Sequence, residues 1–530
     1  MRKQNVLSIC LLVLAFGANA QVTNQVQVYV RPSTEVHVFE NMTNTPTGSF
    51  EVGDEGLLYV DGTLTNNGSM TFNDASSLMR GSTGNDGTGS GTYYVKRQGS
   101  SNSSIYNYWS SPMQSYSGVP GNSNYLYDPT FGTQTYTDDQ PADPGWVAHS
   151  GAMTPGRGYA GRGGGLATFT GDVNNGNVNY SLFYTPDIPG NTAPNTPFNL
   201  VGNPYPSAVS CASLVTANTD ISGALYFWDD DLSGGTGYSN TDYAVWNGTG
   251  SLGTGSGSAG APNGIISTGQ GFKVKAISPS AVLNFTNSMR VANTTQFFRM
   301  SGEDAKIYFS VEGNNYFNQI LIGVMEDATD GVDRLYDATK VRGNHLLSLA
   351  AQQDGEDFCI MAFPPPSVQK VIPLTVVTEE SGIYTFTANS MENFNNEQVY
   401  FVDTETGLEI QLEEGTEIPV SIMAGEYTDR FYLNFWPEML VTGIDRNKPK
   451  ESYAAYYHGG NLHVSYSGNS TDTDVTVALY DMSGRTVMNA TQYGVAGGQA
   501  MFDMHMLANG VYVARILSSG AEFTQKIMKY

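Results

Sequence analysis

Short alternating segments separated by glycine-containing turns run through almost the whole of this 530-residue chain. Glycine adopts the positive φ angles that tight hairpin turns require, so Asn-Gly and Asp-Gly pairs between apolar runs indicate hairpins. Such pairs stand at Asn67-Gly68, Asn175-Gly176, Asn247-Gly248, Asn263-Gly264, Asn509-Gly510, Asp61-Gly62 and Asp354-Gly355. Between turns, apolar residues recur at every second position, as in Leu462, Val464 and Tyr466, which is the period of a half-buried strand. Helical periodicity is almost absent, and the sequence therefore predicts an all-β fold.

The N-terminal part of the predicted fold, residues 21–91, has the pattern of a β-solenoid. Short apolar strands follow each other between Leu57 and Phe72, separated by tight polar turns. Stacked repeats bury their apolar faces only against neighbouring repeats, so two or three rungs are expected to pack onto the next module. The glycine-rich run from Gly81 to Gly91 is expected to be a flexible connection.

Two larger modules are expected after this segment, each with alternating strands and many turns. Residues 92–290, which are rich in aromatic side chains, are predicted to form a β-sandwich-like module with long loops, and residues 291–437 a second β-sandwich module. Polar and proline-bearing residues in 438–452 indicate a linker. A terminal module, residues 453–530, follows, and the chain is thus predicted to consist of tandem β modules.

The N-terminus carries the three-part pattern of a secretory signal peptide in residues 1–20. Two cations precede an apolar run from Val6 to Phe16, and small residues lead to a cleavage site between Ala20 and Gln21. Cys10 lies inside the apolar run rather than directly after the cleavage site, so a lipid anchor is not expected. No other segment approaches the ~18 uninterrupted apolar residues that a membrane helix needs, and no membrane-spanning segment is expected after signal removal.

Charge and cysteine content restrict the possible partners, the surface composition and the disulfide bonding of the chain. The formal net charge is −25, which makes the polyanionic backbone of nucleic acid an unfavourable partner. Only 14% of residues are charged, against about 25% in an average soluble protein, so the surface is expected to be rich in uncharged polar residues. Beyond the signal peptide, Cys211 and Cys359 stand in different predicted modules and are expected to be isolated buried thiols, with a single bridge between them as the alternative.

Closely spaced motifs mark residues 453–530 as a distinct module. A strand runs into the turn Asp481–Arg485, in which Gly484 is expected to supply the bulge of a hairpin. The step from Gly510 to Tyr512 begins a further strand whose alternate residues face one side. Basic residues close the module.

With these motifs, residues 453–530 resemble the type A C-terminal sorting domain of type IX secretion cargo. In that family the domain is a small immunoglobulin-like sandwich of seven strands, which the secretion machinery recognises at the outer membrane. The resemblance implies that the sorting signal includes Asp481, Gly484, Arg485, Gly510, Tyr512, Lys526 and Lys529. A terminal sandwich that only stabilises the chain is the alternative, since short motifs also occur by chance.

The resemblance also implies partners and a location. In the family, cargo passes through the periplasm, and a sortase-like peptidase usually removes the sorting domain and can attach the cargo to a surface lipopolysaccharide. The chain is therefore expected to be secreted or attached to the outer face of the outer membrane. Upstream phrases, such as Asn199–Pro206 and Asp429–Phe435, resemble modules of large, poorly characterised surface proteins and imply no activity.

Known catalytic motifs are missing from the sequence. No pair among the six histidines has the HExxH spacing of a zinc site, and the chain has no GxSxG elbow, no GxxxxGK[ST] phosphate loop and no CxxC pair. No catalytic residue and no cofactor-binding residue is therefore assigned.

Two acidic loops are candidates for Ca²⁺, because carboxylate oxygens are its preferred ligands. The first candidate set is Asp229, Asp230 and Asp231. The second contains Asp327, Asp330 and Asp333. Neither has the alternating ligand spacing and distal Glu of an EF-hand loop, and a solvated acidic turn is the alternative at both places.

Tryptophan residues could provide flat surfaces for sugar rings, whose apolar faces stack on aromatic planes. Four of them stand in the aromatic module, namely Trp109, Trp146, Trp228 and Trp246. Core packing explains tryptophans in a sandwich equally well, and the exposure of the rings distinguishes the two interpretations.

The sequence therefore leaves two principal functions open. The first is an adhesive or structural surface protein without catalytic activity, because an export signal is joined to several β modules that lack catalytic motifs. The second is a secreted protein that binds or hydrolyses carbohydrate, which needs a cleft with exposed aromatic rings and converging carboxylates. In either case the ligand is expected to be a glycan or a protein.

Overall fold

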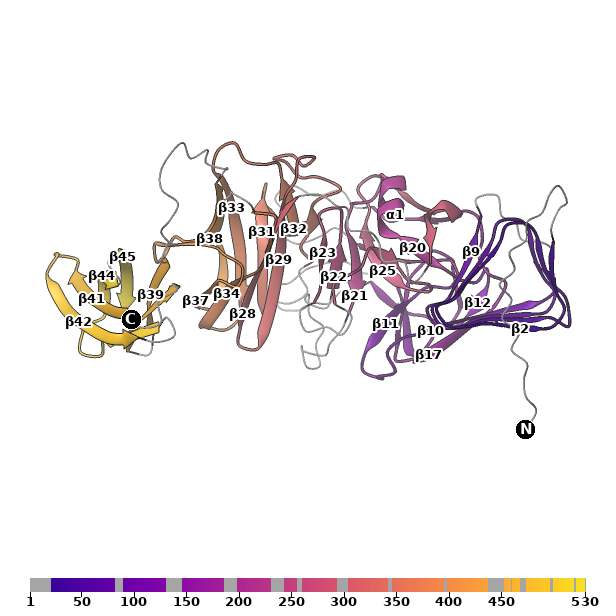
Figure 1. Cartoon of the computed structure of the whole chain (residues 1–530), viewed down its shortest axis with the longest axis horizontal. Helices are drawn as coiled ribbons and strands as arrows, with labels where there is room; N and C mark the ends of the chain where they lie inside the picture. The colour runs from indigo at the N-terminus through magenta and orange to yellow at the C-terminus, as the bar shows by residue number, and fades with distance from the viewer. Residues whose placement is uncertain are drawn as a thin grey trace.

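The computed structural model is a row of β modules, with the N-terminal solenoid at one end of the long axis and the C-terminal module at the other (Figure 1). Among the described residues the one α-helix is α1 (Cys211–Ala217), the one 3-10 helix is η2 (Asn287–Met289), and all other regular elements are strands. The all-β prediction is thus confirmed. The structure describes residues 21–81, 89–129, 145–184, 198–229, 243–254, 260–292, 304–341, 346–394, 398–436, 452–458, 460–467, 473–495, 499–518 and 521–529.

The N-terminal strands form a β-solenoid, as predicted, and the structure shows that it is three-sided and parallel. Each rung contributes one strand to each of three sheets, and successive rungs pair in parallel. The first sheet contains β1 (Val22–Asn24), β4 (Met42–Asn44) and β7 (Leu64–Asn66). The second contains β2 (Gln27–Val30), β5 (Ser49–Val52) and β8 (Ser69–Phe72). The third contains β3 (Glu35–Val38), β6 (Leu57–Val60) and β9 (Ser77–Arg80).

A ladder of buried asparagine side chains runs through the solenoid. The amide of Asn24 donates to Oδ1 of Asn44 at 2.9 Å, and the amide of Asn44 donates to Oδ1 of Asn66 at 2.8 Å. The amide of Asn44 also donates to the main-chain oxygen of Ser69 at 3.1 Å. None of the three asparagines is more than 6% exposed. Buried polar groups need hydrogen-bond partners, so the ladder determines which residues of successive rungs lie above one another.

The second solenoid sheet continues into the next segment. β10 (Thr92–Gln98) pairs in parallel with β8, and β17 (Leu166–Gly171) pairs antiparallel with β10. One apolar core runs from Val30 to Val173 across both segments. The solenoid is therefore joined to the following module by a shared sheet, and the predicted boundary at residue 91 falls between two strands of that sheet.

Several small antiparallel sheets make up the rest of the first large module. The strands before Val173 contribute to the core shared with the solenoid, and the later ones surround a second apolar core that runs from Leu182 to Met289 and includes α1. The strands are β11 (Tyr106–Trp109), β12 (Tyr116–Ser117), β13 (Asn122–Tyr127), β14 (Trp146–Ala148), β15 (Ala152–Met153), β16 (Tyr159–Arg162), β18 (Val178–Ser181), β19 (Phe198–Gly202), β20 (Ala208–Ser210), β21 (Leu225–Trp228), β22 (Tyr243–Trp246), β23 (Ser251–Leu252), β24 (Ile265–Ile266), β25 (Gly271–Lys275), β26 (Val282–Phe285) and β27 (Arg290–Val291).

One sheet of eleven strands forms the second large module. Its inner face encloses a single core that includes residues of both edge strands, such as Ile410 and Ile418, so the sheet curls and supplies both layers of the module. A buried ion pair joins Arg430 to Asp403 at 2.9 Å. The strands are β28 (Ala305–Gly313), β29 (Tyr316–Val324), β30 (Ala338–Thr339), β31 (Leu347–Gln353), β32 (Glu356–Phe363), β33 (Lys370–Thr378), β34 (Gly382–Glu392), β35 (Gln398–Asp403), β36 (Leu408–Gln411), β37 (Glu417–Ile422) and β38 (Gly425–Trp436).

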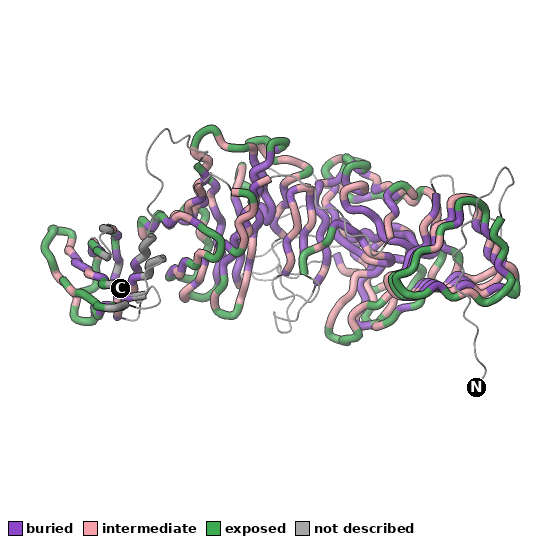
Figure 2. The backbone as a smooth tube through the Cα atoms, viewed as in Figure 1, coloured by how far each residue is buried: buried purple, intermediate pink, exposed green. Residues whose placement is uncertain are grey.

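The C-terminal module is a sandwich of two antiparallel sheets. The side chains of Tyr512, Ala514 and Ile516 alternate into its core, as predicted, and Figure 2 shows the buried interior of each module framed by exposed loops. One sheet contains β39 (Ser452–His458), β40 (Asn461–Ser467) and β43 (Gln499–Asp503). The other contains β41 (Thr473–Asp481), β42 (Thr486–Val495), β44 (Gly510–Ser518) and β45 (Ala521–Lys529).

Replacing the middle asparagine of the ladder tests its contribution to stability. Asn44→Ala removes the acceptor of the Asn24 amide and the donor to Asn66 Oδ1 and Ser69 O, which should lower the free energy of unfolding by about 2–4 kcal/mol. The matched control is Thr43→Ala on the same strand, because the Thr43 hydroxyl bonds only the exposed side chain of Gln21 among the described contacts, and it should cost at most about 0.5 kcal/mol. Urea unfolding of both variants measures the difference, and equal losses would contradict the role of the ladder.

Candidate functional site

A strap, defined as residues 327–340, follows β29 and includes β30. It crosses from the eleven-stranded sheet to the first large module, residues 92–290, which is named the sandwich module after its predicted fold. The main-chain N–H of Gly223 donates to Arg334 O at 2.7 Å, and that of Gly248 donates to Leu335 O at 2.8 Å. In the other direction, the Arg334 guanidinium donates to Ile221 O at 3.1 Å. The sandwich therefore provides both donors and acceptors for the strap.

Further hydrogen bonds hold the middle of the strap. The side chains of Asn247 and Thr249 both donate to the main-chain oxygen of Tyr336, at 2.7 and 2.6 Å. A small apolar core that combines residues of both modules, including Tyr226 and Ile360, lies beside these contacts. The strap thus fixes the orientation of the two large modules relative to each other.

A groove of about 330 Å³ lies along the strap at this junction. Carboxylates of the second large module and one cation from each module line it, so it could hold a polar ligand. Its charged lining residues are Lys275, Asp333, Arg334, Asp337, Asp354 and Glu356. This groove is the candidate ligand site of the chain.

Asp337 is the most perturbed acid of the groove. Burial raises the pKa of its carboxyl from 3.8 to about 6, although the main-chain N–H groups of Asp333 and Ala362 partly oppose the shift. The two N–H groups donate to the carboxylate at 2.6 and 2.8 Å. An acid with a raised pKa in a groove is a common feature of functional sites, but structural networks produce it as well.

The acidic residues of the strap make hydrogen bonds within the protein. The Asp333 carboxylate accepts from the Thr329 N–H at 2.5 Å and from the Thr329 hydroxyl at 3.1 Å, and Asp330 forms an ion pair with Lys370 at 2.8 Å. In the described part of the chain, no group of three or more His, Cys, Asp or Glu is arranged to hold a metal ion. Asp327, Asp330 and Asp333, the second Ca²⁺ candidate, all lie in the strap.

The first Ca²⁺ candidate is placed only in part. Asp229 is buried, and its carboxylate accepts from the hydroxyl of Thr254 at 3.1 Å. Asp230 and Asp231 lie outside the described residues. The signal cleavage site is likewise only half described, because Ala20 precedes the first described residue, Gln21.

Trp109, Trp146 and Trp228 contact other aromatic rings, whereas Trp246 packs against the apolar core around α1. Trp109 is 2% exposed, whereas Trp228 stacks on Tyr108 with ring centres 5.6 Å apart, and Trp146 lies 5.7 Å from the same tyrosine. Lys273, 6% exposed, places Nζ 4.9 Å from the ring centre of Tyr243. Trp109 is thus enclosed, whereas Trp146, Trp228 and Trp246 are half-buried.

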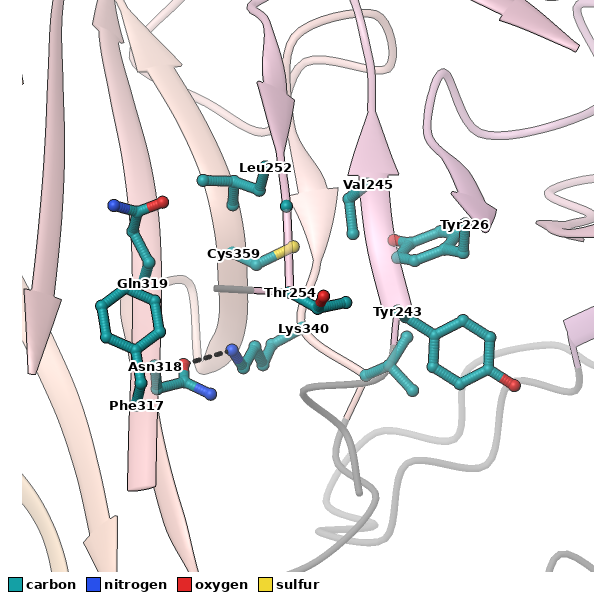
Figure 3. A pocket seen from close by; sticks show the side chains of 12 residues that line it. Tyr226, Tyr243, Val245, Leu252, Thr254, Phe317, Asn318, Gln319, Lys340 and Cys359 are labelled. Atoms are coloured by element: carbon teal, nitrogen blue, oxygen red, sulfur yellow. Dashed lines mark hydrogen bonds between the residues drawn. The ribbon is translucent and has the colours of Figure 1, made fainter. Parts of the chain in front are cut away.

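A second, smaller hollow of about 30 Å³ lies between β22, β29 and β32. Lys340, at the end of the strap, donates from Nζ to Oδ1 of Asn318 at 2.6 Å within it (Figure 3). Cys359 lines the same hollow, and its thiol contacts the main-chain oxygen of Ala338 at 3.5 Å. Cys359 and Cys211 are both buried free thiols in separate apolar cores, in agreement with the prediction of isolated thiols.

The turn of the C-terminal module is held together by one carboxylate. Asp481 accepts from the Ser483 hydroxyl at 2.6 Å and from the main-chain and guanidinium N–H groups of Arg485 at 3.0 and 3.1 Å. These bonds, that of Ser483 first, lower the pKa of Asp481 to about 2. Gly484 has a φ of +80°, which explains why glycine stands at this turn position. Arg485 itself is 78% exposed.

The closing residues of the C-terminal module have different environments. Lys529 is buried, and its ammonium group donates to the main-chain oxygens of Met504, His505 and Leu507 at 2.7, 3.3 and 2.6 Å. The Tyr512 hydroxyl donates to Ala508 O at 2.5 Å, whereas the Lys526 side chain is exposed. Gly510 begins β44. The predicted sorting residues therefore comprise internal braces and exposed side chains.

The sequence analysis did not identify two arginines at the module junctions, of which Arg290 is buried and Arg334 is partly buried. Arg290 is 4% exposed and donates to Ser207 Oγ at 2.9 Å and to the main-chain oxygen of Leu78 in the solenoid. Arg334 makes the equivalent link at the next junction. A single arginine with no neighbouring motif gives no signal in one sequence, since its acceptors are main-chain oxygens of distant segments.

Two family models match the chain. The model described as "Domain of unknown function (DUF8693)" matches residues 14–435, and the model described as "Secretion system C-terminal sorting domain" matches residues 459–530. No curated protein matches the chain. In the described residues, no helix is both long and apolar enough to cross a membrane.

Solved structures show only distant similarity. The β-glucuronidase of Parabacteroides merdae has 12% identity and a TM-score of 0.12 over 28% of this chain and 28% of its own. The β-1,2-glucanase of Parabacteroides distasonis has 9% identity and a TM-score of 0.11 over 35% of this chain and 34% of its own. A structure described as "Biofilm associated protein - BSP domain" has 10% identity and a TM-score of 0.15 over 82% of this chain and 95% of its own. The chain spans about a third or less of the two glycosidases, and scores this low support no conclusion.

Asp337→Asn tests the carboxyl of the groove through the pH dependence of stability. Because the pKa is raised from 3.8 to about 6, the protonated carboxyl stabilises the fold fully below the unfolded value, and this contribution is lost as the pH rises through about 6. The free energy of unfolding of the native protein, relative to the variant, should therefore fall by on the order of 1–3 kcal/mol between about pH 4 and pH 7. Asp330→Asn, at a site 77% exposed, is the matched control. A difference independent of pH would contradict the assignment.

Lys529→Met tests the buried brace of the C-terminal module. The variant keeps an apolar stem but leaves three main-chain oxygens without their donor, so the module should lose about 2–4 kcal/mol of stability. Lys526→Met, at an exposed position of the same strand, should change stability by less than about 0.5 kcal/mol. Thermal unfolding and the amount of exported protein measure both effects, and an unchanged Lys529→Met protein would refute the brace.

Proposed function

This chain belongs to the family of the Domain of unknown function (DUF8693), and we propose that it is an adhesive or structural surface protein without catalytic activity. Its secretion system C-terminal sorting domain makes it a cargo of type IX secretion, exported through the periplasm to the cell surface or the medium. The function of the other modules after export is the subject of the proposal.

The observation that carries the proposal is the position of the sorting domain at one end of a row of modules. The solenoid lies at the opposite end of the long axis (Figure 1). If the chain is attached to the surface near its C-terminus, as the family of the sorting domain implies, the solenoid is the part furthest from the membrane. An elongated molecule with a distal module suits contact with other surfaces.

Fixed junctions support the same interpretation. Between solenoid and sandwich, Arg290 and the Leu78 N–H, which donates to Pro206 O at 2.7 Å, link the two modules. Between sandwich and eleven-stranded sheet, the strap makes the hydrogen bonds described above. Charged donors to main-chain oxygens that are removed from water are among the stronger protein hydrogen bonds, so the row resists bending at these two points.

The first rung of the solenoid offers an apolar contact surface. Its strands have partners on one side only among the described residues, and four large apolar side chains on it are exposed by 40 to 75%. They are Val22, Val26, Tyr29 and Phe39. Apolar side chains gathered at one end of a protein often mark a place of contact with a partner.

The roles of the sorting residues and the processing steps belong to this proposal. The exposed Arg485 and Lys526 are suited to contact the secretion machinery, whereas Asp481, Gly484, Gly510, Tyr512 and Lys529 maintain the shape that it recognises. A sortase-like peptidase then removes the sorting domain and joins the body to lipopolysaccharide, and cleavage between Ala20 and Gln21 precedes both steps. Ca²⁺ at Asp229, Asp230 and Asp231 remains part of the proposal.

Adhesion measurements on cells test the proposed function. In a strain that lacks the gene, complementation with the double variant Tyr29→Asp and Phe39→Asp should restore adhesion several-fold less than the native gene, because charges replace exposed apolar side chains. Val368→Asp is the matched control, since Val368 is 73% exposed on another module. Antibody labelling verifies equal surface amounts. Equal adhesion of the deletion strain and the native strain would refute the proposal.

Carbohydrate binding is the second candidate, and the groove at the strap is the observation that favours it. The groove combines carboxylates with Lys275 and Arg334, and such groups can bond sugar hydroxyls. Incubation of the secreted protein with a glycan array, with and without Ca²⁺, tests this candidate. Binding that is lost in Glu356→Gln would support it, whereas binding that persists in this variant would place the sugar elsewhere.

A further inference from the structure

Lys340 and Asn318 form a close pair of buried, chemically complementary side chains. Lys340 is 9% exposed and Asn318 is 3% exposed, and Nζ lies 2.6 Å from Oδ1. The two side chains come from the end of the strap and from β29 and point toward each other (Figure 3). The amine of one residue therefore lies beside the amide carbonyl group of the other.

The surroundings of the pair favour attack of the amine on the amide. The Leu349 N–H donates to the same Asn318 Oδ1 at 3.2 Å, which polarises the carbonyl and would stabilise negative charge on its oxygen. Tyr226, Val245 and Leu252 contribute to the lining of the hollow. Side chains held in contact by a folded core react as if their concentration were very high.

A carboxylate stands on the strand beside the lysine. The Lys340 N–H donates to Asp357 O at 2.7 Å, which continues the antiparallel pairing of β30 with β32. Opposite residues of an antiparallel pair place their side chains on the same face, so Asp357 and Lys340 are cross-strand neighbours. The Thr375 hydroxyl donates to Asp357 Oδ1 at 2.7 Å and orients the carboxylate.

We propose that Lys340 and Asn318 form an intramolecular isopeptide bond in the folded protein. The lone pair of the neutral amine attacks Cγ of Asn318, a bond forms between Nζ and Cγ, and the bond between Cγ and Nδ2 breaks. Asp357 takes a proton from the attacking nitrogen and passes it to the leaving one. One ammonia molecule is released, no electrons are transferred, and no co-reactant is required.

The bond would protect the strap. It closes residues 318–340 into a covalent ring that contains the whole strap, so tension along the chain would pass through the bond and would not extend the strap. The hydrogen bonds between strap and sandwich would then hold under load. This inference does not depend on the adhesive function, and the two can fail separately.

Peptide mapping of the exported native protein tests the bond directly. Trypsin cuts after Lys306, Arg334 and Arg342, and it does not cut after a lysine whose amine is acylated. The expected product is a branched peptide in which Ile307–Arg334 is joined to Leu335–Arg342, with a mass lower than the sum of the two by one ammonia. Complete recovery of unlinked Ile307–Arg334 and Leu335–Lys340 from folded protein would overturn the proposal.

Variants distinguish the chemistry from simple packing. Lys340→Arg keeps the charge and a hydrogen-bond donor but lacks the reactive amine, so the branched peptide should disappear and the midpoint of thermal unfolding should fall. In Asn318→Asp the leaving group is water, so a branched peptide from this variant should be lighter than the sum of its two parts by one water and not by one ammonia. Asp357→Asn should slow or abolish the reaction in a protein that still folds by circular dichroism. Lys370→Arg, at the ion pair with Asp330, is the control and should leave the branched peptide unchanged.

Discussion

The arrangement of this molecule depends on arginines at the module junctions that donate to main-chain oxygens of other segments. Arg290 reaches the main-chain oxygen of Leu78 in the solenoid, and Arg334 reaches Ile221 in the sandwich. A buried carbonyl without a donor destabilises a protein by about 1–3 kcal/mol, so each arginine satisfies a group that would otherwise favour separation of the modules. The apolar contacts between modules then stay in place because their polar surroundings are satisfied.

The same solution recurs inside the modules, in a chain that has only 25 lysines and arginines against 50 acidic residues. Lys529 donates hydrogen bonds to three main-chain oxygens of the sorting domain, and Arg430 forms an ion pair with Asp403 in the eleven-stranded sheet. A buried cation is expensive to desolvate unless several acceptors surround it. Because the chain has few cations, each buried one fixes a particular set of acceptors and is no longer at the surface. The remaining surface is therefore strongly acidic.

Local patterns in the sequence were sufficient for the fold class and the solenoid, and the resemblance of the terminal motifs to a known family was sufficient for the sorting domain. Each of these follows from residues close in sequence, such as the alternation that places Tyr512, Ala514 and Ile516 in the core. The asparagine ladder was not foreseen, although Asn24, Asn44 and Asn66 recur at nearly regular intervals. Asparagine is common in turns, so its recurrence in a turn-rich chain does not identify a buried ladder until the rungs are seen in register.

The sequence by itself determined that the chain is built from strands and that it ends in an export module, because strand alternation, turn glycines and the terminal motif are local properties. Only the tertiary structure decided where the acidic strap lies, that the groove follows it, and that Lys340 meets Asn318. These relations join residues of different strands and modules, and their distances result from the packing of whole sheets. Spacing along the sequence does not determine these distances, so the candidate site could be identified only from the tertiary structure.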